Sequence, residues 1–159
     1  MAFDGLGPIM FKGGVSSVVT SLGANDPELG TRVTSGGNEY AFVYNDGLAV
    51  GQNQICVIQS GSSGYSVTGS SVVGVDPCFG VAKNAAIANG SYGWVMTRGF
   101  SKVEVASAAV SGMMLAAGTD GQATDPLAAA STAATGFVFA RTTEQTGACG
   151  AAMCYVNCF

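Results

Sequence analysis

The sequence predicts an all-β protein, a small antiparallel β-barrel or sandwich with glycine-rich turns and an extended N-terminal arm. Apolar and polar residues alternate with a period of two along several short segments, which is typical of strands with one buried face. The chain of 159 residues contains 24 glycines, roughly twice the usual share of about 7%. Because these glycines punctuate the alternating segments, they favour tight turns between short strands, as in a sandwich or barrel.

Residues 1–37 predict the extended arm, and residues 38–159 predict a β-rich domain. The first segment is irregular and rich in glycine, and it holds two of the four prolines. Four of its apolar side chains need a partner surface to bury them, namely Phe3, Ile9, Met10 and Phe11. A strand-poor lid on the same domain is the alternative, and the residue pattern leaves both open.

Regular alternation begins at Glu39. The segment EYAFVYN (39–45) places three aromatic residues on one face and an alanine and a valine on the other. The Asp-Gly pair that follows, at 46–47, is turn chemistry that supplies residues able to adopt a positive φ. Further strands are expected at 54–60, 65–75 and 79–84, and a turn is expected at 88–91.

The segment YGWVMTRGFSKVEVA (92–106) predicts a long or bulged strand pair. Two glycines bracket WVMTR, as expected of a strand flanked by bulges or tight bends. Simple alternation then places Trp94, Met96 and Arg98 on one face. In SKVEVA the valines alternate with a lysine and a glutamate, which predicts a half-buried strand with one solvated face.

The remaining segments predict mostly strands. SGMMLAAGTDGQATD (111–125) indicates two short strands around a TDG turn. PLAAASTAATG (126–136) is the only candidate helix, although it reads more readily as a loop rich in alanine and threonine. GFVFARTTEQ (136–145) and AAMCYVNCF (151–159) predict the closing strands.

The charge balance excludes some classes of function. Charged residues make up 10% of the chain, against about 25% in an average protein. A nucleic-acid-binding protein needs a basic stripe, whereas this chain has a net charge of −4 and only six Lys+Arg. A surface this poor in charge favours burial against protein partners. A coat of Ser, Thr, Asn and Gly is the alternative.

Neither a membrane span nor a secretory signal is predicted. The most apolar windows are interrupted by Gly, Ser, Thr or Asn before about 18 residues. The start, MAFDGLGPIMFKGG, lacks a basic stretch followed by a long apolar run. We therefore expect the protein to be made in a cytoplasm, and its odd number of cysteines fits that better than a secreted disulfide framework.

No catalytic, cofactor-binding or metal-binding site is predicted. The chain contains no histidine, which removes the commonest general base and the commonest metal ligand. The acidic residues favour turn positions: Asp46 and Asp120 precede glycine, and Asp125 precedes proline. The glycines do not form a phosphate-binding loop.

The cysteines near the end of the chain are the most suggestive motif. Cys149, Cys154 and Cys158 do not match the paired spacing of a zinc site. On a strand, Cys154, Val156 and Cys158 share one face. Packing of small apolar thiols in the core is the leading interpretation. A disulfide across strands or between subunits, and a metal site, remain alternatives.

The order of the segments resembles the small β-rich capsid decoration, or cement, proteins of tailed bacteriophages. NEYAFVYNDGLAV is followed by GVAKNAAIANGSYGWVMTRGFSKVEV, then by SGMMLAAGTDGQA and TGFVFARTTEQ. The shared pattern is one of turn glycines, alternating strands and a glycine-bounded hairpin, over roughly residues 38–159. The first 37 residues are not covered by it, and the cysteine-rich end departs from the pattern of the group.

The resemblance implies a non-enzymatic virion protein, made in the host cytoplasm, that binds the outer capsid surface and stabilises contacts between neighbouring capsomers. Its partners would be the major capsid protein and further copies of itself, as a dimer or trimer, without nucleic acid, membrane or cofactor. The apolar residues of the arm would anchor it. Trp94 and Arg98 are interface candidates because both residue types are enriched at hot spots.

The main alternative is a receptor- or carbohydrate-binding module displayed on a fibre or spike. It would use Trp94 and the tyrosines as a platform on which sugars stack. An enzyme is disfavoured because no sequence feature supports one, and a major shell subunit is disfavoured because such subunits are usually longer.

Overall fold

The computed structural model describes residues 14–59, 64–69, 78–106, 114–124, 137–140 and 150–158. Within these residues the regular structure is almost entirely strand, so the predicted all-β class is confirmed. The exceptions are two 3₁₀ turns, η1 (Gly14–Ser16) and η2 (Thr119–Gly121). All strands belong to one mixed sheet, which does not close into a single barrel.

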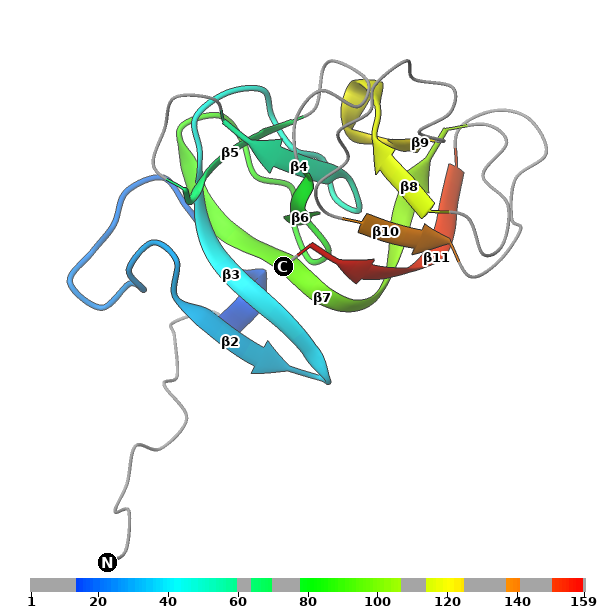
Figure 1. Ribbon diagram of the computed structural model, residues 1–159. Coiled ribbons are helices and arrows are strands. Elements are labelled where there is room, and N and C mark those ends of the chain that lie inside the picture. The colour runs from blue at the N-terminus through cyan, green and yellow to red at the C-terminus, as the bar shows by residue number, and fades with distance from the viewer. Residues whose placement is uncertain are drawn as a thin grey trace, which may run out of the picture.

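The described residues form eleven strands (Figure 1). Their bounds are β1 Val18–Val19, β2 Arg32–Ser35, β3 Asn38–Asn45, β4 Ile55–Ile58, β5 Ser66–Gly69, β6 Cys78–Val81, β7 Ser91–Val105, β8 Met114–Ala117, β9 Ala123–Thr124, β10 Phe137–Ala140 and β11 Gly150–Asn157. Their order in the sheet is β11-β10-β8-β9-β7-β6-β4-β5-β3-β2, and β1 pairs with β7. Most pairs are antiparallel, but β3–β5 and β7–β9 are parallel.

The 15-residue strand β7 organises the whole sheet. Its first half pairs with β3, from Ser91 to Arg98. Its second half pairs with β11, from Arg98 to Val105. Figure 1 shows β7 as the long curved strand that runs from the β3–β6 side of the molecule to the β8–β11 side. Because β7 belongs to both sides, it fixes how they sit together.

Two groups of buried side chains lie against β3 and β7, and they follow the predicted alternation of 39–45. The first core cluster contains Tyr40, Phe42, Ile55, Val57, Cys78, Val81, Trp94, Met96, Val103, Val105, Leu115, Ala117, Ala123, Ala152, Cys154, Val156 and Cys158. The second core cluster contains Ala41, Val43, Val50, Cys56, Val67, Phe79, Ala82, Ile87 and Val95. Both faces of β3 are therefore buried, each in a different cluster.

A β-bulge in β7 changes which residues face outward. Tyr40 of β3 is opposite Met96, but its neighbour Glu39 is opposite Arg98, so Thr97 is an extra residue in β7. Even-numbered residues of β7 enter the first core cluster before the bulge, and odd-numbered residues enter it afterwards. The prediction that Arg98 shares a face with Trp94 and Met96 is therefore wrong, because simple alternation ignores the bulge.

Strand pairing crosses the expected boundary at residue 37. Strand β2 pairs with β3 in a hairpin, and β1 pairs with β7 at Tyr92 and Gly93. Residues 14–37 are thus tied to the β-rich body by main-chain hydrogen bonds. Phe3, Ile9, Met10 and Phe11, the proposed anchors, lie outside the described residues, as does the candidate helix at 126–136.

Two of the three predicted turns behave as expected. Strands β8 and β9 pair around the TDG turn, where Asp120 has φ 56° and Gly121 has φ 71°. Gly90 in the 88–91 turn has φ 74°. Neither Asp46 nor Gly47 adopts a positive φ; among described non-glycine residues only Asn53 and Asp120 do. The buried amide of Asn45 instead holds this loop, by donating to the carbonyls of Leu48 and Ile87.

Candidate functional site

The outward sides of β7 and β11 form one surface of exposed and half-buried side chains, which we call the β7–β11 face. Its residues are directly opposite one another in the antiparallel ladder, so they lie on the same side of the sheet. They are Arg98, Phe100, Lys102 and Glu104 on β7, and Asn157, Tyr155, Met153 and Ala151 on β11. The intervening residues of both strands point into the core.

Large apolar side chains are exposed at the centre of the β7–β11 face. Phe100 is 44% exposed and Met153 is 37% exposed. The ring of Phe100 packs against Tyr155, with centroids 4.9 Å apart. The ladder continues through β10 to β8, where Met114 is also exposed. Contiguous exposed apolar groups of this kind are typical of protein-binding surfaces.

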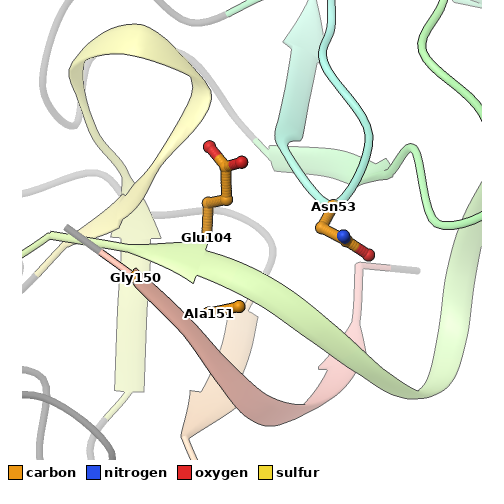
Figure 2. A pocket seen from close by; sticks show the side chains of 4 residues that line it. All are labelled: Asn53, Glu104, Gly150 and Ala151. Atoms are coloured by element: carbon orange, nitrogen blue, oxygen red, sulfur yellow. The ribbon is translucent and has the colours of Figure 1, made fainter.

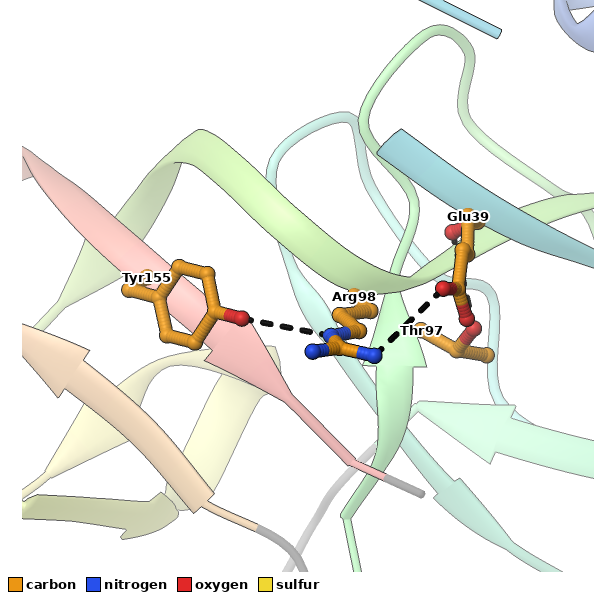
Figure 3. A network of polar contacts seen from close by, with 4 residues as sticks. All are labelled: Glu39, Thr97, Arg98 and Tyr155. Carbon is orange, nitrogen blue, oxygen red and sulfur yellow. Dashed lines mark hydrogen bonds and ion pairs between the residues drawn. The ribbon is translucent and has the colours of Figure 1, made fainter. Parts of the chain in front are cut away.

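Arg98 lies at one end of the face, in a small polar network (Figure 3). Its Nε donates to the Tyr155 hydroxyl at 3.3 Å, and its Nη1 lies 3.6 Å from Glu39 Oε1. The hydroxyl and then the carboxylate raise the pKa of Arg98. The side chains of Arg98 and Glu39 are 55% and 43% exposed, so the ion pair between them adds little stability in water.

Glu104 lies at the other end of the face, beside a recess of about 270 Å³ (Figure 2). The recess is lined by Asn53, Glu104, Gly150 and Ala151. Gln54 positions the carboxylate by donating from Nε2 to Glu104 Oε2 at 2.9 Å. Gln54 is itself fixed, because its Oε1 accepts the Gly51 N–H at 2.7 Å. The recess therefore holds one oriented negative charge.

The local backbone explains why Asn53 borders this recess. Asn53 adopts φ 65°, which asparagine tolerates better than most residues. Its N–H donates to the Ala82 carbonyl and its carbonyl accepts the Glu104 N–H, at 2.8 and 2.9 Å. The turn before β4 is thus attached to the edge of β7 that is not paired with β11.

Three buried thiols lie close together in the interior. Cys78 Sγ and Cys158 Sγ are 3.3 Å apart, and Cys56 Sγ donates to the Gly80 carbonyl at 3.5 Å. The hydrogen bond with Cys158 and burial raise the pKa of Cys78, and burial raises the pKa of Cys56. The four described cysteines are free thiols, and all four are buried. Cys149 lies outside the described residues.

The structure separates the two interface candidates named from the sequence. Trp94 is only 2% exposed and lies in the first core cluster, against Phe42 at a centroid distance of 5.1 Å. It therefore does not form a platform for sugars in this structure, and neither does Tyr40, which is buried beside it. Arg98 is at the surface, on the β7–β11 face.

Sequence reasoning missed Phe100, Met153 and Tyr155 as surface residues. The signal for them was present but ambiguous: Gly99 interrupts the alternation of β7, and a glycine inside a strand often marks a bulge. Which residues turn outward after the interruption depends on how β3 pairs with β7, and a single sequence does not contain that register.

Neither a metal centre nor a membrane-spanning helix emerges from the described part of the chain. No group of three or more His, Cys, Asp or Glu side chains there is arranged to hold a metal ion. The helical segments described are two three-residue turns, and neither is long or apolar enough to cross a membrane. A comparison with models of known protein families found none that matches this chain, and no curated protein is significantly similar to it.

Proposed function

We propose that this protein is a non-enzymatic structural component of a tailed-phage virion that binds the outer capsid surface and stabilises neighbouring capsomers. The observation that carries the proposal is an exposed apolar sheet face on a chain with only 10% charged residues. A surface of that kind is suited to contacts with other proteins. The order of glycine turns and strands, which resembles that of decoration proteins, supports the capsid as the partner.

The proposed contact with the capsid itself uses the apolar residues Phe3, Ile9, Met10 and Phe11 of the arm, whereas the exposed sheet face is suited to contacts between copies of this chain. Thirteen residues precede the described chain, and in extended form they span at most about 45 Å. Burial of about 600 Å² of apolar surface contributes roughly 15 kcal/mol before ordering costs, which remove most of it. Repetition over a symmetric shell makes such modest contacts collectively strong.

A co-sedimentation experiment tests this function. The purified protein is mixed with heads assembled from the major capsid protein of the same phage, and bound protein is measured in the pelleted heads. We expect saturable binding, and at least a tenfold weaker affinity when residues 2–13 are deleted. Far-UV circular dichroism of the truncated protein should be unchanged, because β1 to β11 begin after residue 13.

The matched control replaces Leu48, which is 54% exposed and lies outside the arm. Leu48→Ser should leave head binding unchanged. Failure of the full chain to sediment with heads, or full affinity of the truncated protein, contradicts the proposal. A glycan array run alongside identifies the carbohydrate-binding alternative, which predicts sugar binding without heads.

A further inference from the structure

The β7–β11 face has charges of opposite sign at its two ends. Along β7 the outward residues run from Arg98 through Phe100 and Lys102 to Glu104, symmetrically about Ser101. Opposite them, β11 presents Tyr155 and Met153 around Cys154. At about 3.3 Å per residue, Arg98 and Glu104 lie about 20 Å apart. The face therefore has Arg98, beside Glu39, at one end and Glu104 at the other, with Phe100, Met153 and the exposed cation Lys102 between them.

This arrangement is complementary to itself under a twofold rotation. In an isologous contact, residue i of one copy meets residue j of the other, and j meets i. Consider a twofold axis that lies in the plane of the face, runs perpendicular to the strands and crosses β7 at Ser101. It places Arg98 opposite Glu104 of the second copy. The same axis places Phe100 opposite Lys102, a cation–π pair, and Met153 opposite Tyr155, a sulfur–aromatic pair.

The recess beside Glu104 fits the incoming arginine. Its volume of about 270 Å³ exceeds that of one side chain, and it opens beside the face at Ala151. Glu104 Oε2 accepts one bond from Gln54, which leaves acceptor capacity on both carboxylate oxygens. Arg98 is 55% exposed, and its side-chain contacts within the described residues are long, at 3.3 Å to Tyr155 and 3.6 Å to Glu39. A guanidinium has five donors, so it can bind a second carboxylate.

We propose that two copies of this chain associate face to face through the β7–β11 face, with Arg98 of each copy entering the Glu104 recess of the other. About seven residues each of β7 and β11, with the four-residue strands β10 and β8 that continue the ladder, give a face of roughly 350 Å² per copy at about 4.8 Å between strands and about 3.3 Å per residue. That is at the small end for specific interfaces, so the dimer is weak and dependent on concentration. Its formation does not require a capsid, so it can be tested separately from the proposed function.

Charge reversal in solution tests the pairing. Sedimentation equilibrium is measured for the wild-type chain, for Arg98→Glu, for Glu104→Arg and for an equimolar mixture of the two variants. In either variant alone, both reciprocal contacts bring like charges together, so we expect dimerisation at least about tenfold weaker. In the mixture, each variant meets the opposite charge twice, so we expect dimerisation to return to the wild-type level.

The matched control is Arg32→Glu, which reverses an exposed charge on β2, outside the face. It should leave the dimer unchanged. Because Glu104→Arg removes the bond from Gln54, its fold is checked by thermal unfolding. If that variant does not fold, Arg98→Glu and Phe100→Ser must each weaken the dimer by at least about tenfold. A wild-type chain that is monomeric at millimolar concentration, or a mixture that does not recover, overturns the proposal.

Discussion

At the scale of single residues, the thiols show how burial decides chemistry. Cys78 and Cys158 are 80 positions apart in sequence, yet their sulfur atoms lie 3.3 Å apart in the core. Burial disfavours a thiolate, in agreement with the raised pKa of Cys78 and Cys56. Cys78 and Cys56 therefore act as small apolar groups at neutral pH.

The raised thiol pKa values predict how stability depends on pH. The pKa of Cys56 in the folded state lies above the reference value of 9.0. Above about pH 9 the unfolded chain therefore loses the Cys56 proton while the folded chain keeps it, so stability falls as pH rises. We expect a slope of roughly 1 kcal/mol per pH unit for this thiol. Below pH 9 it makes no contribution to the slope.

Urea unfolding of the wild-type chain and of Cys56→Ala between pH 7 and pH 10.5 measures this slope. The variant lacks the thiol and should lose less stability above pH 9, although it starts from a lower free energy of unfolding because Cys56 is fully buried. Because the two chains differ only at residue 56, a difference between their slopes is assigned to the Cys56 thiol. Parallel curves for the two proteins would contradict the assignment.

At the scale of the element, β7 depends on one glycine beside its bulge. Gly99 has φ 127°, and it lies where the partner of β7 changes from β3 to β11. A Cβ at this position would collide with Asn38 Oδ1. That oxygen accepts the Phe100 N–H at 3.0 Å. Because Gly99 has no side chain, Asn38 can accept the hydrogen bond from the Phe100 N–H at the point where the β7–β11 face begins.

Gly99→Ala should therefore destabilise the protein by more than backbone strain alone. A non-glycine residue at positive φ costs about 1–3 kcal/mol, and the collision with Asn38 adds to this. Gly36→Ala is the matched control, because Gly36 also has a positive φ, 57°, but has no atom within 4 Å of an added Cβ. Free energies of unfolding in urea compare the two variants. Equal losses would mean that the Asn38 contact is unimportant.

At the scale of the whole molecule, the two core clusters are joined through β3 and β7. Val95 belongs to the second cluster while its neighbours Trp94 and Met96 belong to the first. A strand buried on both faces cannot leave one cluster while it remains in the other. We therefore expect the described body to unfold in one cooperative transition.

Trp94 is the only tryptophan in the chain, and it reports on the first core cluster alone. Ile87→Val removes one methylene from the second cluster and should cost about 1 kcal/mol. If unfolding is cooperative, the urea midpoint measured by Trp94 fluorescence shifts to lower concentration by the same amount as that measured by circular dichroism. Leu48→Ala, at an exposed site, should leave both midpoints unchanged. A midpoint that shifts by circular dichroism only would show that the clusters unfold independently.

The sequence by itself determined the all-β class, most of the strand positions and two of the turns. These features depend on local chemistry: period-two alternation requires a strand with distinct faces, and residues such as Gly90, Asp120 and Gly121 accept a positive φ. The same local reasoning placed Cys154 and Cys158 on one face of the closing segment, and both are buried, Cys154 within β11 and Cys158 directly after it. Local reasoning did not predict that Cys78 lies against Cys158.

Only the tertiary structure decided which side of each strand became the surface. Period-two alternation indicates that the two faces of a strand differ, but a one-residue bulge reverses which of them is buried. The bulge at Thr97 depends on the pairing of β7 with β3. For that reason Trp94 became core while Phe100 became surface. Long-range pairing likewise brought Arg98 beside Glu39 and Tyr155, because the contacts of a sheet join residues far apart in sequence and no local pattern records their register.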